Sequence, residues 1–152
     1  METRTIAEFD AKFRTEDLLV VRNAYWRWAV RPQQCTLGAT VLSAARECYA
    51  WSNMTPEEFV GLKKMLGTVE AALKTCFSPD KLNYLMLMMI DSHVHFHVLP
   101  RYGGERRFHG AVWTDESWPG PPNLLQAAPV DGGLSEIRES LKAAATDNGR
   151  PS

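Results

Sequence analysis

Three of the chain's four histidines fall within five residues, in the stretch His93-Val-His95-Phe-His97. Side chains alternate between the two faces of a β-strand, so these imidazoles would share one face, with neighbours about 6.6–6.8 Å apart. The apolar residues that alternate with them would share the other face and pack in the core: Val94, Phe96 and Val98. An imidazole can serve as nucleophile, proton carrier or metal ligand, so the pattern predicts a site that performs chemistry.

Three explanations compete for this pattern. A solvated, histidine-rich strand would require three of four histidines to gather on one face by chance. A zinc site would use a His-x-His pair, but one ion bound at about 2.0–2.1 Å hardly reaches three residues in line, and Asp91 is the only nearby carboxylate. We favour covalent catalysis, in which the central imidazole attacks phosphorus while its neighbours and nearby arginines neutralise the phosphoryl oxygens.

The segment His93-Val-His95-Phe-His97-Val-Leu-Pro-Arg101 resembles the motif of the histidine triad (HIT) superfamily. It is most similar to the branch of the fragile histidine triad, or dinucleoside polyphosphate, hydrolases, and the resemblance covers about residues 17–108. It implies a five-stranded antiparallel sheet with two helices, a homodimer, and hydrolysis or transfer at the α-phosphate of a nucleotide. By position, it implies that His95 forms a nucleotidyl-histidine intermediate and that His93 and His97 bracket the phosphate.

The residues that would hold the substrate depart from the family's pattern. Ala39 stands where a histidine commonly follows the glycine matched to Gly38, and Arg31-Pro-Gln33 replaces an Asn or Asp that holds the ribose. Other side chains are therefore the candidates for substrate contacts: Asn83, Ser92, Arg101, Arg31 and Arg27. We expect the substrate to be a dinucleoside polyphosphate or to resemble a nucleoside phosphoramidate. The alternatives are a nucleotide-binding or sensing protein with little turnover, and a metal-dependent enzyme that uses the His-x-His pair.

Capping residues and periodicity predict the elements that position the histidines. Thr5 precedes a short helix that carries Phe9 and Phe13, and Thr55-Pro56 begins a long helix. The long helix has an apolar stripe of helical period: Phe59, Leu62, Leu66, Val69, Leu73 and Cys76. Five runs have the character of strands: Leu18–Val21, Tyr25–Val30, Leu37–Ala44, Leu82–Met89 and His93–Leu99. The turn Ile90-Asp91-Ser92 would join the last two in a hairpin.

Short connections between strands predict an α+β domain, with the long helix on one face of an antiparallel sheet and the histidines on the opposite, open face. We expect one domain over residues 1–146, with its core in 17–108, followed by a frayed tail at 147–152. Residues 109–146 would form a C-terminal arm that ends in a short helix over Leu134–Leu141.

Within the arm, the segment Trp113–Pro122 would pack on the body of the protein or on a second subunit, and the loop residue His109 would be solvated.

Composition limits the classes of partner. The chain has 152 residues, 45% hydrophobic and 23% charged, and a formal charge of −1, which argues against nucleic acid or an anionic membrane as the partner. Three cysteines without a C-x-x-C pair indicate reduced thiols. The opening METRTIAEFD lacks the apolar run of a signal peptide. The apolar run Leu85 to Ile90 is too short to span a bilayer. We expect a cytoplasmic homodimer without a tightly bound cofactor, and a divalent metal ion only as companion of a polyphosphate substrate.

Overall fold

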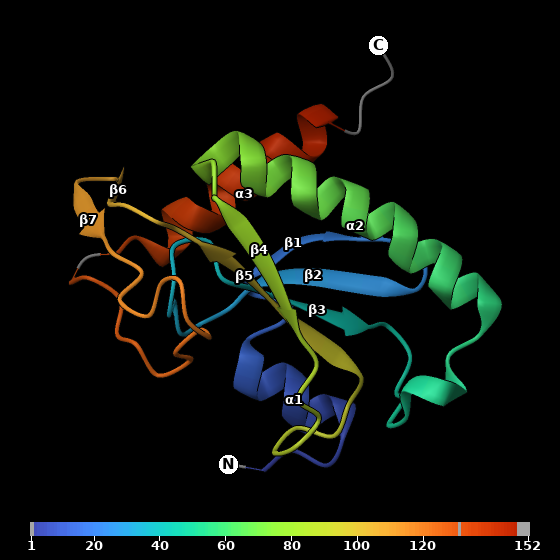
Figure 1. Ribbon diagram of the computed structural model, residues 1–152. Coiled ribbons are helices and arrows are strands. Elements are labelled where there is room, and N and C mark those ends of the chain that lie inside the picture. The colour runs from blue at the N-terminus through green and yellow to red at the C-terminus, as the bar shows by residue number, and fades with distance from the viewer. Residues whose placement is uncertain (1, 131, 149–152) are drawn as a thin grey trace.

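A five-stranded antiparallel sheet forms the centre of the computed structural model, which describes residues 2–130 and 132–148 (Figure 1). The strands are β1 (Leu19–Arg22), β2 (Trp26–Val30), β3 (Thr40–Ala44), β4 (Lys81–Leu85) and β5 (His95–Arg101), in the spatial order β1-β2-β3-β5-β4. All four neighbouring pairs are antiparallel. The predicted α+β class and five-stranded sheet are confirmed.

Two helices cover one face of this sheet, and Figure 1 shows both on the same side. Helix α2 (Pro56–Phe77) begins with the predicted cap, because Thr55 and Glu58 hydrogen-bond each other's backbone in a capping box. Helix α3 (Leu134–Asn148) packs beside α2 and extends seven residues beyond the predicted Leu141; residues 149–152 of the predicted tail lie outside the described residues. The core between helices and sheet contains fully buried side chains from both: Trp26, Trp28, Leu42, Val69, Leu73, Val98, Ile137 and Leu141.

A third helix, α1 (Ile6–Phe13), lies on the opposite face of the sheet, below it in Figure 1. Thr5 caps it by accepting a hydrogen bond from the backbone N–H of Glu8. Its apolar residues Phe9 and Phe13 are 0% and 8% exposed, so they are buried against the sheet. The expectation that the histidine face is open is therefore wrong: α1 uses this second face to bury its own apolar side.

The connection between β4 and β5 differs from the predicted hairpin. β4 ends at Leu85, four residues before the predicted Met89, and the chain then forms a loop until His95 begins β5. The loop pairs with other parts of the chain: Asp91 forms an isolated bridge with Thr3, and the N–H of Val94 donates to the carbonyl of Cys48 at 2.7 Å. His93 consequently precedes the strand on which it was predicted.

Two further boundaries have simple physical causes. β3 begins at Thr40 and not at the predicted Leu37, because Gly38 has a φ of +84° in the left-handed region. A small hairpin leads into the arm: β6 (Arg106–Phe108) pairs with β7 (Ala111–Trp113), and its two-residue turn has positive φ at both His109 and Gly110. A short 3₁₀ helix (Trp51–Asn53) precedes α2. Over residues 2–130 and 132–148, no helix is long and apolar enough to cross a membrane.

Candidate active site

His95 is held in one orientation and one tautomer by its own neighbour. Its Nδ1 lies 2.6 Å from the carbonyl oxygen of His93, and a carbonyl only accepts, so Nδ1 carries the proton. In a neutral ring the other nitrogen, Nε2, then keeps its lone pair. Nε2 has no hydrogen-bond partner in the part of the chain that the structure describes, and the ring lines a cavity. His95 is therefore arranged as a nucleophile would be.

His97 and His93 differ in where they face. His97 lines the same cavity, its ring centroid is 5.1 Å from that of His95, and its buried Nδ1 has no partner. His93 does not line the cavity, because its Nε2 donates to the carbonyl of Ala44 at 2.8 Å and its Nδ1 accepts from the N–H of Cys48 at 3.4 Å. The structure thus brings His95 and His97 together at the cavity. The ring of His93 is bonded to backbone groups away from it, and the carbonyl of His93 orients His95.

The cavity beside the two histidines has a volume of about 360 Å³. Sites for small molecules commonly have volumes of about 300–1,000 Å³ with mostly apolar walls and a few polar groups. Here the walls come from α1, the end of β2, the loop before β5 and the arm: Lys12, Phe13, Arg31–Gln33, Leu87–Asp91, Leu124 and Leu125. The arrangement can hold a ligand of mixed character with a polar group at the histidines.

Burial keeps the three imidazoles uncharged near neutral pH. They are only 1%, 2% and 5% exposed, for His93, His95 and His97. Burial is the main cause that lowers the pKa of each, and it brings the pKa of His97 to about 3 with added repulsion from His95 and Arg31. A neutral imidazole has the free lone pair that nucleophilic attack requires.

Helix α1 contributes residues that sequence reasoning did not assign to the site. Phe9 packs on His93 and His95 at centroid distances of 5.2 and 5.0 Å. Phe13 packs on His95 and His97 at 6.0 Å from each. Lys12 reaches across to Asp91 in an ion pair of 2.8 Å that ties α1 to the loop before β5. The four-residue spacing of the two phenylalanines predicted an apolar helix face, but no sequence signal indicated the surface that this face would cover.

The candidate Arg27 lies on the face of the histidines, because Arg27 pairs with Ser43 and Ser43 with His95. Arg31 lies four residues later, directly after β2, and falls on the same face by alternation. Arg27 is committed to the fold: it forms an ion pair with Asp10 of α1 at 2.8 Å and donates to Ser43 at 3.2 Å. Arg31, in contrast, lines the cavity. Of these two candidates for substrate contacts, the structure places Arg31 at the site and Arg27 under α1.

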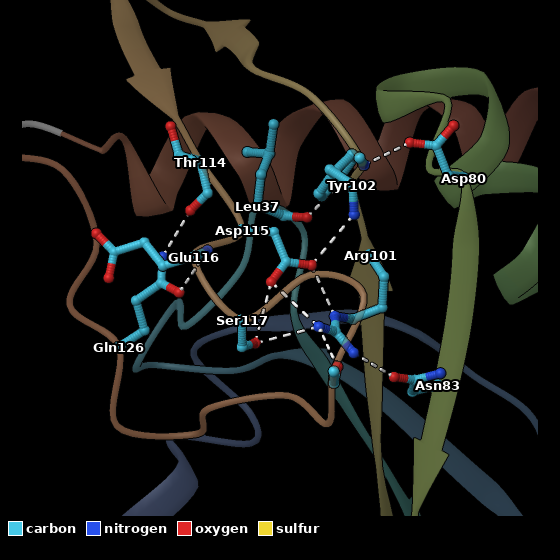
Figure 2. A network of polar contacts seen from close by, with 12 residues as sticks. Leu37, Asp80, Asn83, Arg101, Tyr102, Thr114, Asp115, Glu116, Ser117 and Gln126 are labelled. Atoms are coloured by element: carbon cyan, nitrogen blue, oxygen red, sulfur yellow. Dashed lines mark hydrogen bonds and ion pairs between the residues drawn. The ribbon is translucent and has the colours of Figure 1, made fainter.

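Arg101 and Asn83 lie away from the cavity, in a polar network at the far end of β5 (Figure 2). Arg101 donates to both carboxylate oxygens of Asp115, at 2.7 and 3.2 Å, and to the side-chain oxygen of Asn83 at 2.7 Å. It also reaches Ser117 and the carbonyl of Gly120. Its contacts join the sheet to the arm, and nothing in them points toward His95.

The remaining candidates are also outside the cavity. Ser92 is half-buried in the loop before β5, where its N–H donates to the carbonyl of Thr3 at 3.3 Å, and it is not among the residues that line the cavity. The side chain of His109 is 59% exposed and lies 3.5 Å from Glu136. Among the described residues, no group of three or more His, Cys, Asp or Glu side chains could hold a metal ion.

Comparisons with known proteins bear on the fold. Neither family sequence models nor curated protein sequences give a match. Solved structures do. A hypothetical histidine triad nucleotide-binding protein from Sulfolobus tokodaii has a TM-score of 0.66 and 14% identity, over 88% of this chain and 86% of that one. A histidine triad protein from Sinorhizobium meliloti has 0.65 and 22%, over 89% and 93%. The C. elegans NitFhit protein has 0.61 and 16%, over 84% of this chain and 27% of that one. At these identities the likeness shows the fold alone: the chain has the fold of histidine triad proteins.

Proposed function

We propose that the chain is a member of the HIT superfamily that hydrolyses or transfers a nucleotidyl group at the α-phosphate, through a covalent intermediate on His95. The observation that carries this proposal is the hydrogen bond from His95 Nδ1 to the carbonyl of His93, because it leaves Nε2 with a lone pair beside a cavity. The position of His95 in the motif and the fold support the same assignment. The motif is most similar to that of the fragile histidine triad branch. We propose a dinucleoside polyphosphate or a compound that resembles a nucleoside phosphoramidate as the substrate.

The reaction would proceed in two displacements at phosphorus. Nε2 of His95 forms a bond to the α-phosphorus while the bond to the leaving group breaks, and the leaving group departs with the electron pair and takes up a proton. Water, or another acceptor, then attacks the same phosphorus, gives up a proton and breaks the N–P bond, which restores the neutral imidazole. His97 faces the same cavity and would hydrogen-bond a non-bridging oxygen in both steps.

His93 would act as a positioning residue. Both its ring nitrogens are engaged with backbone groups of Ala44 and Cys48, and its carbonyl orients His95. This carbonyl also stabilises the positive charge that His95 acquires when it attacks, because the Nδ1–H bond strengthens as the ring becomes cationic.

The test is a pair of histidine substitutions with a substrate panel that includes a diadenosine polyphosphate and an adenosine 5′-phosphoramidate. His95→Ala should lower the rate of nucleoside monophosphate release by at least about a thousandfold, because a nucleophile has no substitute. His109→Ala is the matched control, since His109 is exposed and is not among the residues that line the cavity, and it should retain most activity. In His95→Gly, added imidazole should restore part of the turnover. If His95→Ala turns over at the parent rate, the assignment is wrong.

A second candidate function is nucleotide binding with little turnover. The observation that favours it is α1, whose phenylalanines cover histidines that are 5% exposed or less. This alternative predicts that calorimetry detects nucleotide binding while none of the panel releases a nucleoside monophosphate.

We propose further that the protein is a cytoplasmic homodimer that uses the N-terminal half of α2. Tyr25, Phe59 and Val60 are 38%, 41% and 56% exposed near this end of the helix, and aromatic side chains are enriched in interface cores. Trp113 is 4% exposed and packs in the chain's own core, which favours the helix over the arm. Light scattering at high micromolar concentration should give twice the mass of one chain, and the mass of a single chain would contradict the proposal.

A further inference from the structure

Arg31 is a buried guanidinium whose position the fold defines closely. It follows the last residue of β2, its N–H donates to the carbonyl of Ala39 at 2.9 Å, and its carbonyl accepts from the side chain of Gln34 at 2.8 Å. The residue is 8% exposed and lines the cavity. Its side chain donates to the carbonyl of Gln33 at 2.6 Å, while Nε is buried without a partner.

Arg31 differs from the other buried arginines because it has no counter-charge. Arg27 pairs with Asp10 at 2.8 Å and Arg101 with Asp115 at 2.7 Å, whereas Arg31 has no carboxylate within ion-pair distance over residues 2–130 and 132–148. A guanidinium does not lose its proton in proteins, so burial leaves a charge that lacks compensation. Such a charge destabilises the folded protein while it has no counter-ion, and an anion bound beside it would remove this destabilisation.

The cavity as a whole therefore carries a surplus positive charge. Its other cation, Lys12, is paired with Asp91 through both carboxylate oxygens at 2.8 and 2.9 Å, and burial keeps His95 and His97 neutral. This leaves the charge of Arg31 as the surplus.

Arg31 and His95 lie at different places along the cavity. β3 separates β2 from β5, which is two strand spacings of about 4.8 Å each. Arg31 is also displaced along the sheet, because it bonds to Ala39, which precedes the Thr40–Val98 pair, whereas His95 pairs with Ser43. This offset of the two backbones favours separate groups for an anion beside Arg31 and a phosphate in contact with Nε2 of His95. Arg31 accordingly adds to the effect of burial in lowering the pKa of His97 but not that of His95.

We propose that Arg31 binds a second anionic group of the substrate, distinct from the phosphate that His95 attacks. This inference rests on the proposed function, and it narrows the substrate to a nucleotide with two anionic groups. The second group is a phosphate, which either belongs to the leaving group, as in a polyphosphate, or is attached to the sugar. Arg31 then determines how strongly the protein prefers a substrate with two anionic groups over a substrate with one.

Three substrates that share an adenosine 5′-phosphoryl group test this proposal. The p-nitrophenyl ester of AMP has no second phosphate, diadenosine triphosphate has two more in its leaving group, ADP, and the ester with an added 3′-phosphate has one on the sugar. In Arg31→Gln, kcat/KM for one doubly anionic substrate should fall about 10- to 100-fold more than for the simple ester, the range expected for a hydrogen bond to a charged group. Whichever substrate shows this drop identifies the position of the second phosphate.

Two further variants separate charge from fold. Arg31→Lys keeps the charge and should preserve part of the preference, whereas Arg107→Gln removes a charge from an exposed position on β6 and should leave the ratio unchanged. If Arg31→Gln lowers kcat/KM equally for all three substrates, or for none, the proposal is overturned.

The unsubstituted protein provides a test that does not depend on the folding of a variant. ADP or adenosine 3′,5′-bisphosphate should compete with the ester at least about tenfold more tightly than AMP, because each offers a second phosphate. Equal inhibition constants for all three nucleotides would overturn the role of Arg31. An absence of turnover with every substrate would instead contradict the proposed function, and direct binding of the three nucleotides would still decide on Arg31.

Discussion

Replacing Asp115 with Asn should reveal how strongly the arm is attached to the sheet. The Arg101–Asp115 pair is almost fully buried, with side chains 4% and 1% exposed, and its atoms are 2.7 Å apart. Burial alone would raise the pKa of Asp115, but hydrogen bonds from Arg101 and Tyr102 outweigh it and hold the pKa below its ordinary value. The carboxylate is therefore ionised in the folded protein, and Asp115→Asn leaves Arg101 as a buried charge without a counter-ion (Figure 2).

The expected loss in the free energy of unfolding is about 3–5 kcal/mol, the usual effect of removing one partner of a buried ion pair. With a urea m-value of about 2 kcal/mol per M, the midpoint of unfolding would fall by roughly 2 M. Glu139→Gln is the matched control, because Glu139 pairs with Arg138 at a similar 2.8 Å but with side chains 66% and 23% exposed. Its loss should be about 0–1 kcal/mol.

Urea unfolding followed by far-ultraviolet circular dichroism measures both variants. The double variant Arg101→Met/Asp115→Leu removes both charges and should recover a substantial part of the stability lost in Asp115→Asn. If Asp115→Asn and Glu139→Gln cost the same, burial does not strengthen this pair and the network of Figure 2 does not hold the arm.

Three further predictions concern the histidine face. Folding lowers the pKa values of the three imidazoles, so the unfolded chain binds protons first as the pH falls. The free energy of unfolding should be at its full value above about pH 6.5 and should decrease below it by roughly 1.4 kcal/mol per pH unit for each histidine. Urea unfolding at pH 7.5 and 5.5 would detect this decrease, and equal stability at both pH values would refute it. Phe9→Ala should cost about 3–5 kcal/mol of stability, because Phe9 is 0% exposed; a loss below 1 kcal/mol in the same assay would mean that α1 does not pack on the histidines as described. Turnover of the p-nitrophenyl ester of AMP should survive incubation with a chelator, since the proposed reaction uses no tightly bound metal, and loss of activity that added zinc restores would favour the metal-dependent alternative.

The sequence predicted the sheet and the strand that carries His95 and His97, because period-two alternation and turn residues are local signals. It also predicted the start of α2, since Thr55 caps the helix and Pro56 is its first residue. His93 was predicted on the strand, but its position depends on backbone bonds to residues near Ala44 and Cys48, almost fifty positions away. Alternation cannot report contacts of that kind.

The parts of the site that sequence reasoning missed also depend on distant contacts. Arg101 lies four residues after His97 at the end of the motif, which suggested a role with substrate, yet its partner Asp115 lies on the arm. Arg27 and Arg31 are four residues apart, so alternation assigns both to the same strand face, and only the position of Asp10 on α1 distinguishes the paired arginine from the unpaired one. The packing of α1 over the histidines likewise depends on tertiary contacts. The sequence shows that this helix has an apolar face, but not which surface the face covers.

The central claim is that His95 forms a covalent bond to phosphorus, and mass spectrometry of the quenched enzyme tests it most directly. The enzyme is mixed with an adenylyl substrate, quenched in base, because acid would destroy a phosphoramidate, and digested with trypsin. We expect an adenylyl adduct on His95 in the peptide Leu82–Arg101, and this adduct should disappear in His95→Ala. Steady release of AMP without any adduct on this peptide, or an adduct on another residue, would contradict it.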